Sequence, residues 1–293
     1  MKDIKIAVIG GDMRQCYIAT ALKQDGCTVS AYGIKGELSD ICATLEEAIE
    51  NASFIILPYP VSPDGVYLNA VCEECNIKIS ELFSLIRDCG IKMTYGGGFK
   101  SNIKELAAQV GISIFDYGES EALKIKNALC TAEGAIEVAM RELPINIHGS
   151  RSTVLGYGRI GRLLSCRLKA LGSEVRTVSR SAEALASAGT DGMLAMKLSR
   201  LDNAVSCSDV IFNTAPALVL DQKALLCARS DCLIIDLASA PGGVDFNEAE
   251  RLGIKVIWAL SLPGKCSPKS AAMIICDEIL NHIENTFDLT LNS

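Results

Sequence analysis

The sequence has little of several features that mark common classes of protein. Its 293 residues include two histidines and one tryptophan, and only 5% of them are aromatic. No apolar run approaches the ~20 residues that a membrane-spanning helix needs. The apolar run after Lys2 and Asp3 is too short for a signal peptide and leads directly into a predicted strand. These absences favour a cytoplasmic protein without a membrane segment.

A basic surface and a metal-binding pattern are also missing. The net charge is −7, without long runs of one sign, whereas a nucleic-acid-binding protein usually carries a basic patch. The 13 cysteines come without an export signal and are expected to be reduced and mostly buried. Cys72 and Cys75 form the only C-x-x-C, and no second pair or histidine follows at zinc-site spacing. We expect neither a nucleic-acid partner nor a metal ligand.

One stretch organises the chain. A predicted strand, residues 153–155, leads into a glycine-rich turn, and an amphipathic helical pattern follows up to Gly172. In the dinucleotide fingerprint the first glycine makes the turn, the second admits the pyrophosphate and the third lets the helix lie close to the strand. The pyrophosphate then lies at the positive end of the helix. The predicted cofactor-binding residues here are Gly156, Tyr157, Gly158, Arg159, Ile160 and Gly161.

The next strand indicates which dinucleotide is bound. It ends in Ser179, Arg180 and Ser181, at the place where an enzyme that prefers NAD usually has an acidic residue for the ribose 2′-hydroxyl. A guanidinium flanked by hydroxyls can bind a 2′-phosphate, which a carboxylate would repel. We therefore predict NADP, although Arg180 could instead be a solvated charge at the start of a loop.

Predicted strands and helices alternate along the whole chain, as in open parallel sheets with helices on both faces. The expected fold class is α/β, with two Rossmann-like or flavodoxin-like, doubly wound parallel-sheet domains, a long connecting helix and a C-terminal helix that packs back. The expected parts are a substrate-side domain (1–118), a connecting helix (119–143), an NADP-binding Rossmann domain (144–266) and a C-terminal helix (267–293) with Ser267 as its N-cap.

Polar residues follow two strands of the second domain. Because ligands collect at the carboxyl ends of parallel strands, we expect the adenosine ribose and the nicotinamide to contact these residues. The alternative is that they form ordinary turns. They are Asn213, Thr214, Ala215 and Pro216 after one strand, and Asp236, Ala238 and Ser239 after the next.

Neither histidine is in a position that suits a catalytic role. His148 precedes the first strand of the nucleotide domain, and His282 lies deep in the last helix, so neither suits acid–base catalysis. Instead, several charges are expected near the cofactor, where they would hold a small acid with two carboxylates. Each could equally be an isolated surface charge. They are Arg14, Glu133, Lys265 and Lys269.

A resemblance covers essentially the full length of the chain. The sequence resembles the dipicolinate synthase A-subunit family of spore-forming bacteria, most specifically in the run Pro241-Gly242-Gly243-x-Asp245-Phe246. The other matching motifs, in order, are Gly10-Gly11-Asp12-x-Arg14-Gln15, Ile56-Leu57-Pro58, Glu133-Gly134, His148-Gly149-Ser150, Gly156-x-Gly158-Arg159-x-Gly161, Asn213-Thr214, Asp236-Leu237-Ala238-Ser239 and Leu262-Pro263-Gly264-x-x-x-Pro268-Lys269.

The resemblance implies an activity in the mother cell during sporulation, on the branch that leaves lysine (diaminopimelate) biosynthesis. The implied substrate is (hydroxy)tetrahydrodipicolinate, the product is dipicolinate, and the partner is the dipicolinate synthase B-subunit, which resembles flavoproteins. Combined with the residue analysis, it suggests that Arg14 and Lys269 pair the substrate carboxylates and that Asp12 or Glu133 accepts a proton.

Two alternatives remain. The chain could be an NADP-dependent dehydrogenase for another small diacid or amino acid, or a non-catalytic NADP-binding subunit. A homodimer is expected only because homodimers are common.

Overall fold

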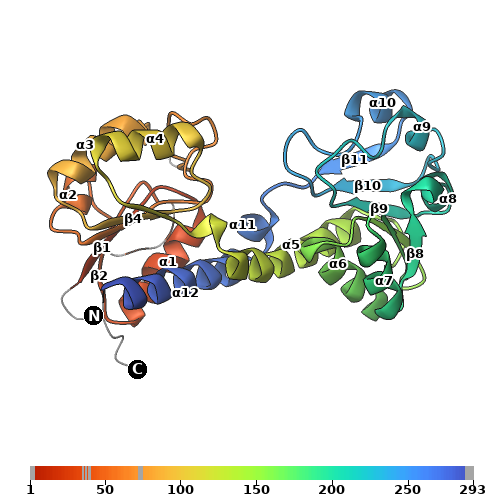
Figure 1. The fold of residues 1–293 in the computed structure, drawn as a ribbon, viewed down its shortest axis with the longest axis horizontal. Helices are drawn as coiled ribbons and strands as arrows, with labels where there is room; N and C mark the ends of the chain where they lie inside the picture. Colours follow the sequence, from red (N-terminus) through yellow and green to blue (C-terminus); the bar gives the residue numbers. More distant parts are fainter. Residues whose placement is uncertain (1–3, 35, 37, 39–40, 72–74, 288–293) are drawn as a thin grey trace. The chain divides into compact units, whose positions relative to one another are not determined.

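The computed structural model describes residues 4–34, 36, 38, 41–71 and 75–287. It divides into two compact units, one formed by Met1–Lys126 with Pro268–Ser293 and the other by Asn127–Ser267. A long helix, α5 (Glu121–Glu142), contributes residues to both units (Figure 1). This arrangement confirms the predicted fold class.

The first unit is built on a five-stranded parallel sheet with the order β2-β1-β3-β4-β5. The order reverses between β1 and β3, and the carboxyl ends of two such strands frame the crevice in which open α/β sheets bind ligands. The strands are β1 (Lys5–Ile9), β2 (Thr28–Tyr32), β3 (Phe54–Ile56), β4 (Met93–Gly96) and β5 (Ile114–Asp116).

Helices cover both faces of this sheet. Successive strand residues point to opposite faces, so Ile6 and Val8 pack on one helical layer while Ala7 and Ile9 pack on the other. The first layer contains α1 (Met13–Gln24) and α12 (Pro268–Phe287), and the second contains α2 (Leu45–Ile49), α3 (Ile79–Asp88) and α4 (Ser101–Val110). A short 3-10 helix, η1 (Tyr117–Glu119), follows β5. The C-terminal helix α12 thus packs back on the N-terminal segment, as predicted.

The predicted N-cap of α12 is wrong. The Ser267 hydroxyl is buried and has no hydrogen-bond partner in the described part of the chain. A short helix, α11 (Leu262–Cys266), ends directly before it, and the Ser267 backbone N–H bonds to the Pro263 carbonyl at 3.3 Å. Ser267 therefore closes one helix and does not cap the next through its side chain.

The second unit contains a six-stranded parallel sheet with the order β11-β10-β9-β6-β7-β8. Its order reverses between β6 and β9, which places a second ligand-binding crevice at their carboxyl ends. The strands are β6 (Arg151–Leu155), β7 (Glu174–Ser179), β8 (Leu194–Lys197), β9 (Val210–Asn213), β10 (Leu233–Asp236) and β11 (Lys255–Trp258).

Two helical layers enclose this sheet as well (Figure 1). Val154 and Phe212 pack toward one layer, whereas Leu155 and Ile211 pack toward the other. The first layer is formed by α5, α6 (Arg159–Ala170) and α7 (Ala182–Thr190), and the second by α8 (Leu201–Ser206), α9 (Gln222–Leu225) and α10 (Phe246–Arg251). A 3-10 helix, η2 (Leu198–Arg200), follows β8.

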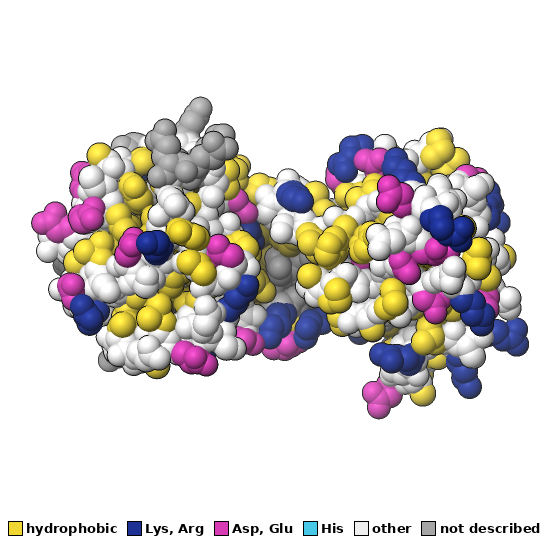
Figure 2. All heavy atoms as spheres, turned by 90° about the horizontal axis from the view of Figure 1, so that it is seen from above, with side chains coloured by type: hydrophobic (Ala, Val, Ile, Leu, Met, Phe, Trp, Pro, Cys, Tyr) yellow, Lys and Arg dark blue, Asp and Glu magenta, His cyan; other side chains and the backbone are white. Residues whose placement is uncertain are grey.

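The surface is mixed in charge. On the face drawn in Figure 2, basic and acidic side chains are interspersed on each unit. Among residues 4–34, 36, 38, 41–71 and 75–287, no helix is long and apolar enough to cross a membrane, and no group of three His, Cys, Asp or Glu side chains is placed to hold a metal ion. Cys72, Glu73 and Glu74 of the only C-x-x-C lie outside the described residues.

Candidate cofactor site

The glycine-rich loop lies at the carboxyl end of β6, in the crevice of the second sheet. Gly156 has a φ of 96°, in the left-handed region that favours glycine. A Cβ atom on Gly161 would lie 2.3 Å from the Gly156 carbonyl oxygen, so a larger residue would push α6 away from the strand. A Cβ atom on Gly158 would meet nothing within 4 Å, and Gly158 is exposed at the N-cap of α6. The loop therefore leaves open space beside the N–H groups that would hold a pyrophosphate.

The side chains within the loop point in different directions. Tyr157 is only 8% exposed, and its hydroxyl donates to Asp191 Oδ2 at 2.8 Å. Ile160 is half-buried against the core of the unit, and Arg159 is exposed. Tyr157 and Ile160 would therefore contact a dinucleotide mainly through their backbone.

Arg180 lines a cavity of 310 Å³ at the carboxyl edge of the sheet. The cavity is also lined by Leu198, Leu218 and Lys223, which come from segments that follow β8 and β9. It thus offers apolar surface for a base and the cation of Arg180 for a phosphate. Asp202 and Asp221 also line it, and Asp202 pairs with Lys223 at 3.5 Å. Of the three residues predicted to bind the 2′-phosphate, Arg180 is the one whose side chain lines this cavity.

The two neighbouring serines support the turn itself. Ser179 Oγ accepts from the Ser181 N–H at 3.2 Å, and Ser181 Oγ caps α7 by accepting from the Ala184 N–H at 3.2 Å. These bonds fix the backbone on both sides of Arg180.

Asn213 and Asp236 are fully buried and bound to each other. Asn213 Nδ2 donates to Asp236 Oδ1 at 2.8 Å. The Asp236 carboxylate also accepts from the N–H groups of Ala238, at 3.0 Å, and Gly243, at 2.8 Å. In the structure the side chains of these two predicted cofactor-binding residues join the loops after β9 and β10. The other residues predicted to bind the cofactor here are the exposed Pro216 and Ser239, the half-buried Thr214 and Ala215, and the buried Ala238.

The contact of Trp258 with the loop after β10 was not predicted from the sequence. This side chain is 40% exposed, stacks on Phe246 with ring centroids 5.2 Å apart, and donates from Nε1 to the Ala238 carbonyl at 2.9 Å. It thereby holds the loop after β10 from the side of β11. A single tryptophan at a strand end carries no sequence signal for such a contact.

In the first unit, Asp12 and Arg14 form an ion pair at the start of α1. Arg14 Nε donates to Asp12 Oδ1 at 2.9 Å, and Nη2 donates to Asp12 Oδ2 at 2.8 Å and to the Tyr59 carbonyl at 2.6 Å. Burial acts to raise the pKa of Asp12, but the hydrogen bonds and charge of Arg14 hold it below its ordinary value. Asp12 is therefore ionised and a weak base, and it orients Arg14 at the carboxyl edge of the sheet.

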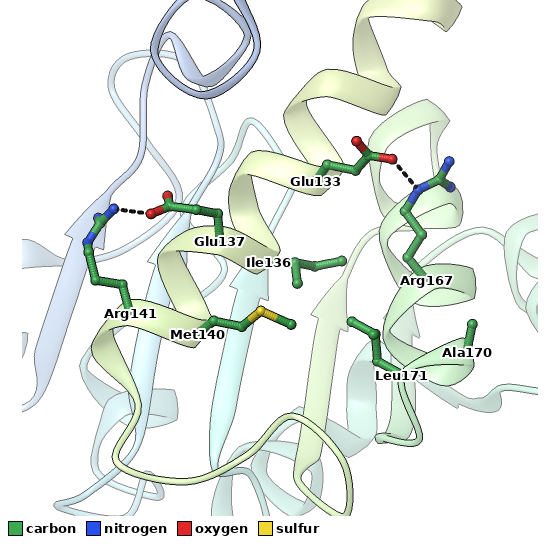
Figure 3. Close-up of a pocket in the computed structure, with 8 residues that line it drawn as sticks. All are labelled: Glu133, Ile136, Glu137, Met140, Arg141, Arg167, Ala170 and Leu171. Carbon is green, nitrogen blue, oxygen red and sulfur yellow. Dashed lines mark hydrogen bonds and ion pairs between the residues drawn. The ribbon is translucent and has the colours of Figure 1, made fainter.

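The remaining predicted catalytic residues are spread over the two units. Glu133 is 60% exposed and accepts from Arg167 Nε at 3.3 Å. It lies on the rim of a groove of 680 Å³ between α5 and α6, in which apolar side chains are flanked by two glutamates and two arginines (Figure 3). Lys265 is exposed on α11 and lines a separate pocket of 450 Å³ together with Trp258. Lys269 is exposed in the first turn of α12, which belongs to the first unit.

Both histidines lie where the sequence placed them. His148 precedes β6, at the amino edge of the second sheet. His282 Nδ1 lies 3.1 Å from the Tyr95 hydroxyl, and its ring packs on Phe115 with centroids 3.8 Å apart. Burial lowers the pKa of His282, as expected for a neutral packing residue.

Within each unit, the structure brings together part of the predicted site. In the second unit the glycine loop, Arg180 and the Asn213–Asp236 pair all lie at the carboxyl edge of one sheet. The first unit holds the Asp12–Arg14 pair. This geometry defines a class: a protein of two parallel α/β units, one of which has the crevice, glycine loop and helix N-terminus of a dinucleotide-binding domain.

Comparisons with known proteins agree. Residues 125–237 match the NAD-binding domain of the D-isomer specific 2-hydroxyacid dehydrogenases, and residues 5–118 match the N-terminal domain of the dipicolinate synthase A-subunit. The chain is 32% identical over 281 residues to the dipicolinate synthase A-subunit of Bacillus subtilis (strain 168), covering 94% of each chain. The chain therefore belongs to the dipicolinate synthase A-subunit family and has a dehydrogenase-type nicotinamide-dinucleotide-binding domain.

Solved structures give the same result. The dipicolinate synthase A-subunit of Bacillus halodurans has a TM-score of 0.86 and 28% identity, covering 96% of this chain and 97% of that one. The corresponding chain of the Bacillus subtilis enzyme has a TM-score of 0.82 and 31% identity, covering 97% and 98%. A transhydrogenase from Sinorhizobium meliloti shares the fold, with a TM-score of 0.72 and 13% identity over 97% and 94% of the two chains.

Proposed function

We propose that the chain is the NADP-dependent component of dipicolinate synthase that oxidises (hydroxy)tetrahydrodipicolinate, by way of dihydrodipicolinate, to dipicolinate. The observation that carries this proposal is the match to the dipicolinate synthase A-subunit over 94% of both chains, together with an open glycine loop at the start of α6. We place the activity in the mother-cell cytoplasm during sporulation, on the branch that leaves lysine biosynthesis.

NADP is proposed as the cofactor because the residues present fit it. Gly158 leaves room for the pyrophosphate at the N-terminus of α6. Arg180 lines the 310 Å³ cavity and would pair the 2′-phosphate, while Lys223 in the same lining balances the charge of Asp202. With NADP bound at the glycine loop, its nicotinamide ring would supply a hydride acceptor.

The protein's own part in the reaction is mainly to position the substrate. Loss of water from the hydroxylated ring gives a dihydropyridine, and removal of a hydride and a proton then gives the aromatic diacid. Aromatisation makes the second step favourable, so no strong base is needed. Arg14, held by Asp12, would pair one carboxylate, and Lys269 would pair the other. Asp12 or Glu133 stays the proposed proton acceptor. Asp12 would act as a weak base, which suffices for a step driven by aromatisation, and Lys265 stays a proposed site residue.

Replacing Arg14 or Lys269 by alanine is expected to raise the apparent Michaelis constant for the substrate about tenfold or more, because each change removes a charge-assisted contact. The constant for NADP should change little. Steady-state kinetics with each reactant varied in turn measure both effects. Arg87→Ala serves as the control, since Arg87 is exposed and pairs with Asp88 at the end of α3. Unchanged substrate kinetics in both variants would rule out this assignment.

A substrate panel separates the proposal from the nearest alternatives. The purified chain is given NADP with freshly generated dihydrodipicolinate precursor, 2-hydroxy acids or amino acids. Turnover confined to the cyclic precursor supports the proposal. Turnover confined to another diacid or amino acid would identify a different dehydrogenase of the same fold.

Two assemblies are proposed as well, one with the dipicolinate synthase B-subunit, the other with a second copy of the chain. The groove of Figure 3 exposes Met140 by 53% and Leu171 by 40%, and its rim carries two glutamates and two arginines. The rim charges already pair within the chain, Glu133 with Arg167 and Glu137 with Arg141, so a two-fold copy would mainly cover the apolar surface.

Met140→Asp is therefore expected to convert a dimer into a monomer in analytical ultracentrifugation. Leu194→Asp, at a residue that is 58% exposed on β8, should leave the dimer intact. A monomeric wild-type chain would contradict the proposed homodimer.

A further inference from the structure

A hydrogen-bond network anchors the glycine loop to a distant turn. Tyr157 is a buried residue between Gly156 and Gly158, and its hydroxyl donates to Asp191 Oδ2 at 2.8 Å. Arg162, in the first turn of α6, donates from Nε to the same oxygen at 2.9 Å. The loop and the start of the helix that follows it thus share one carboxylate.

Asp191 is itself well fixed. It forms the C-cap of α7, and its backbone carbonyl accepts from Lys169 Nζ at 3.0 Å. Hydrogen bonds from Tyr157 and Arg162, together with the charge of Arg162, hold the pKa of Asp191 below its ordinary value despite partial burial. Its side chain is 22% exposed. Asp191 is therefore an ionised acceptor at the end of α7.

The loop needs such an anchor because glycine adopts many backbone conformations. Two of the three residues from Gly156 to Gly158 are glycines, so Tyr157 is the one whose side chain can limit the conformations of this turn. We propose that Asp191 is a positioning residue for the phosphate-binding loop. It fixes Tyr157 and Arg162, and so aims the loop N–H groups at the pyrophosphate without touching the cofactor. This inference rests on the dinucleotide site of the proposed function.

The test compares Asp191→Ala with Asp209→Ala. Asp209 is a matched control in the same unit, because its side chain is 14% exposed and bonds Arg151 Nη2 at 2.6 Å and Arg229 Nη1 at 3.4 Å, but at the amino edge of the sheet. We expect Asp191→Ala to raise the dissociation constant of NADPH, measured by calorimetric titration, about tenfold. Asp209→Ala should leave it within about twofold while lowering thermal stability.

Tyr157→Phe provides a second route, since it removes only the hydroxyl and keeps the buried ring. It should also raise the dissociation constant of NADPH. In the double variant with Asp191→Ala, the loss of binding free energy should be smaller than the sum of the losses in the two single variants. Equal binding by the wild type and both single variants would overturn the inference. So would an equal loss in Asp209→Ala, which would show only a general effect of stability.

Hydrogen exchange separates this inference from the proposed function. If the wild type binds no dinucleotide, the proposed function fails, but the amide exchange of residues 157–160 still decides the inference. Faster exchange at these amides in Asp191→Ala than in Asp209→Ala supports it, and equal exchange overturns it.

Discussion

Replacing Arg180 by aspartate is expected to weaken NADP binding about 10- to 100-fold, because a charge-assisted hydrogen bond contributes about 1.5–3 kcal/mol. Repulsion between the new carboxylate and the 2′-phosphate adds to this loss. NAD carries no 2′-phosphate, and a carboxylate can bond its ribose 2′-hydroxyl, so NAD binding should improve or stay constant. Titrations with NADPH and NADH on both proteins measure the ratio of the two dissociation constants.

Arg200→Asp is the matched control for this prediction. Arg200 is exposed at the end of η2, and its neighbours Ser199 and Leu201 line the 310 Å³ cavity while Arg200 does not. The substitution changes the net charge by the same amount as Arg180→Asp, and so corrects for long-range electrostatics. If the Arg180→Asp variant keeps the wild-type affinity for NADP, Arg180 does not bind the 2′-phosphate.

Gly161→Ala is expected to destabilise the second unit by about 1–3 kcal/mol and to weaken dinucleotide binding more than tenfold. The added Cβ atom would lie 2.3 Å from a backbone oxygen of Gly156, which has no flexible side chain to give way. α6 must then move away from β6, and its N-terminal N–H groups move with it. Urea denaturation followed by the fluorescence of Trp258, the only tryptophan, reports on this unit.

Gly189→Ala provides the opposite case. Gly189 lies in α7, and a Cβ atom there would meet nothing within 4 Å. Alanine stabilises a helix by about 1 kcal/mol relative to glycine, so this variant should be at least as stable as the wild type and should bind the dinucleotide normally. Equal stability of the Gly161→Ala and Gly189→Ala variants would mean that close packing at Gly161 is unimportant.

Much of the fold could be predicted because periodicity and glycine turns report local structure directly. The spacing of apolar residues predicts three elements that the structure contains: the strand before Gly156, the helix after Gly158 and the long helix α5. The short helices α9 and α10 were not predicted, since a turn or two of helix has too few residues to show a period. The helix in residues 262–266 was missed for the same reason.

The roles of single side chains were harder to predict. Asn213 and Asp236 were recognised as residues at strand ends, but their mutual hydrogen bond depends on the register of β9 and β10. Asp191 precedes Gly192 between a helix and a strand, which reads as an ordinary turn. Its contact with Tyr157 spans 34 residues of sequence, and no local pattern records it.

The chain itself is proposed to couple NADP reduction to the formation of dipicolinate. The most direct measurement mixes the purified chain with NADP and freshly generated dihydrodipicolinate precursor, in one mixture with the dipicolinate synthase B-subunit present and in another without it. NADPH and dipicolinate are followed together, and the two products should rise in step with the chain alone. Turnover only when the B-subunit is present would show that the chain is half of an active site, and no turnover with NADP or NAD in either mixture would contradict the proposed chemistry.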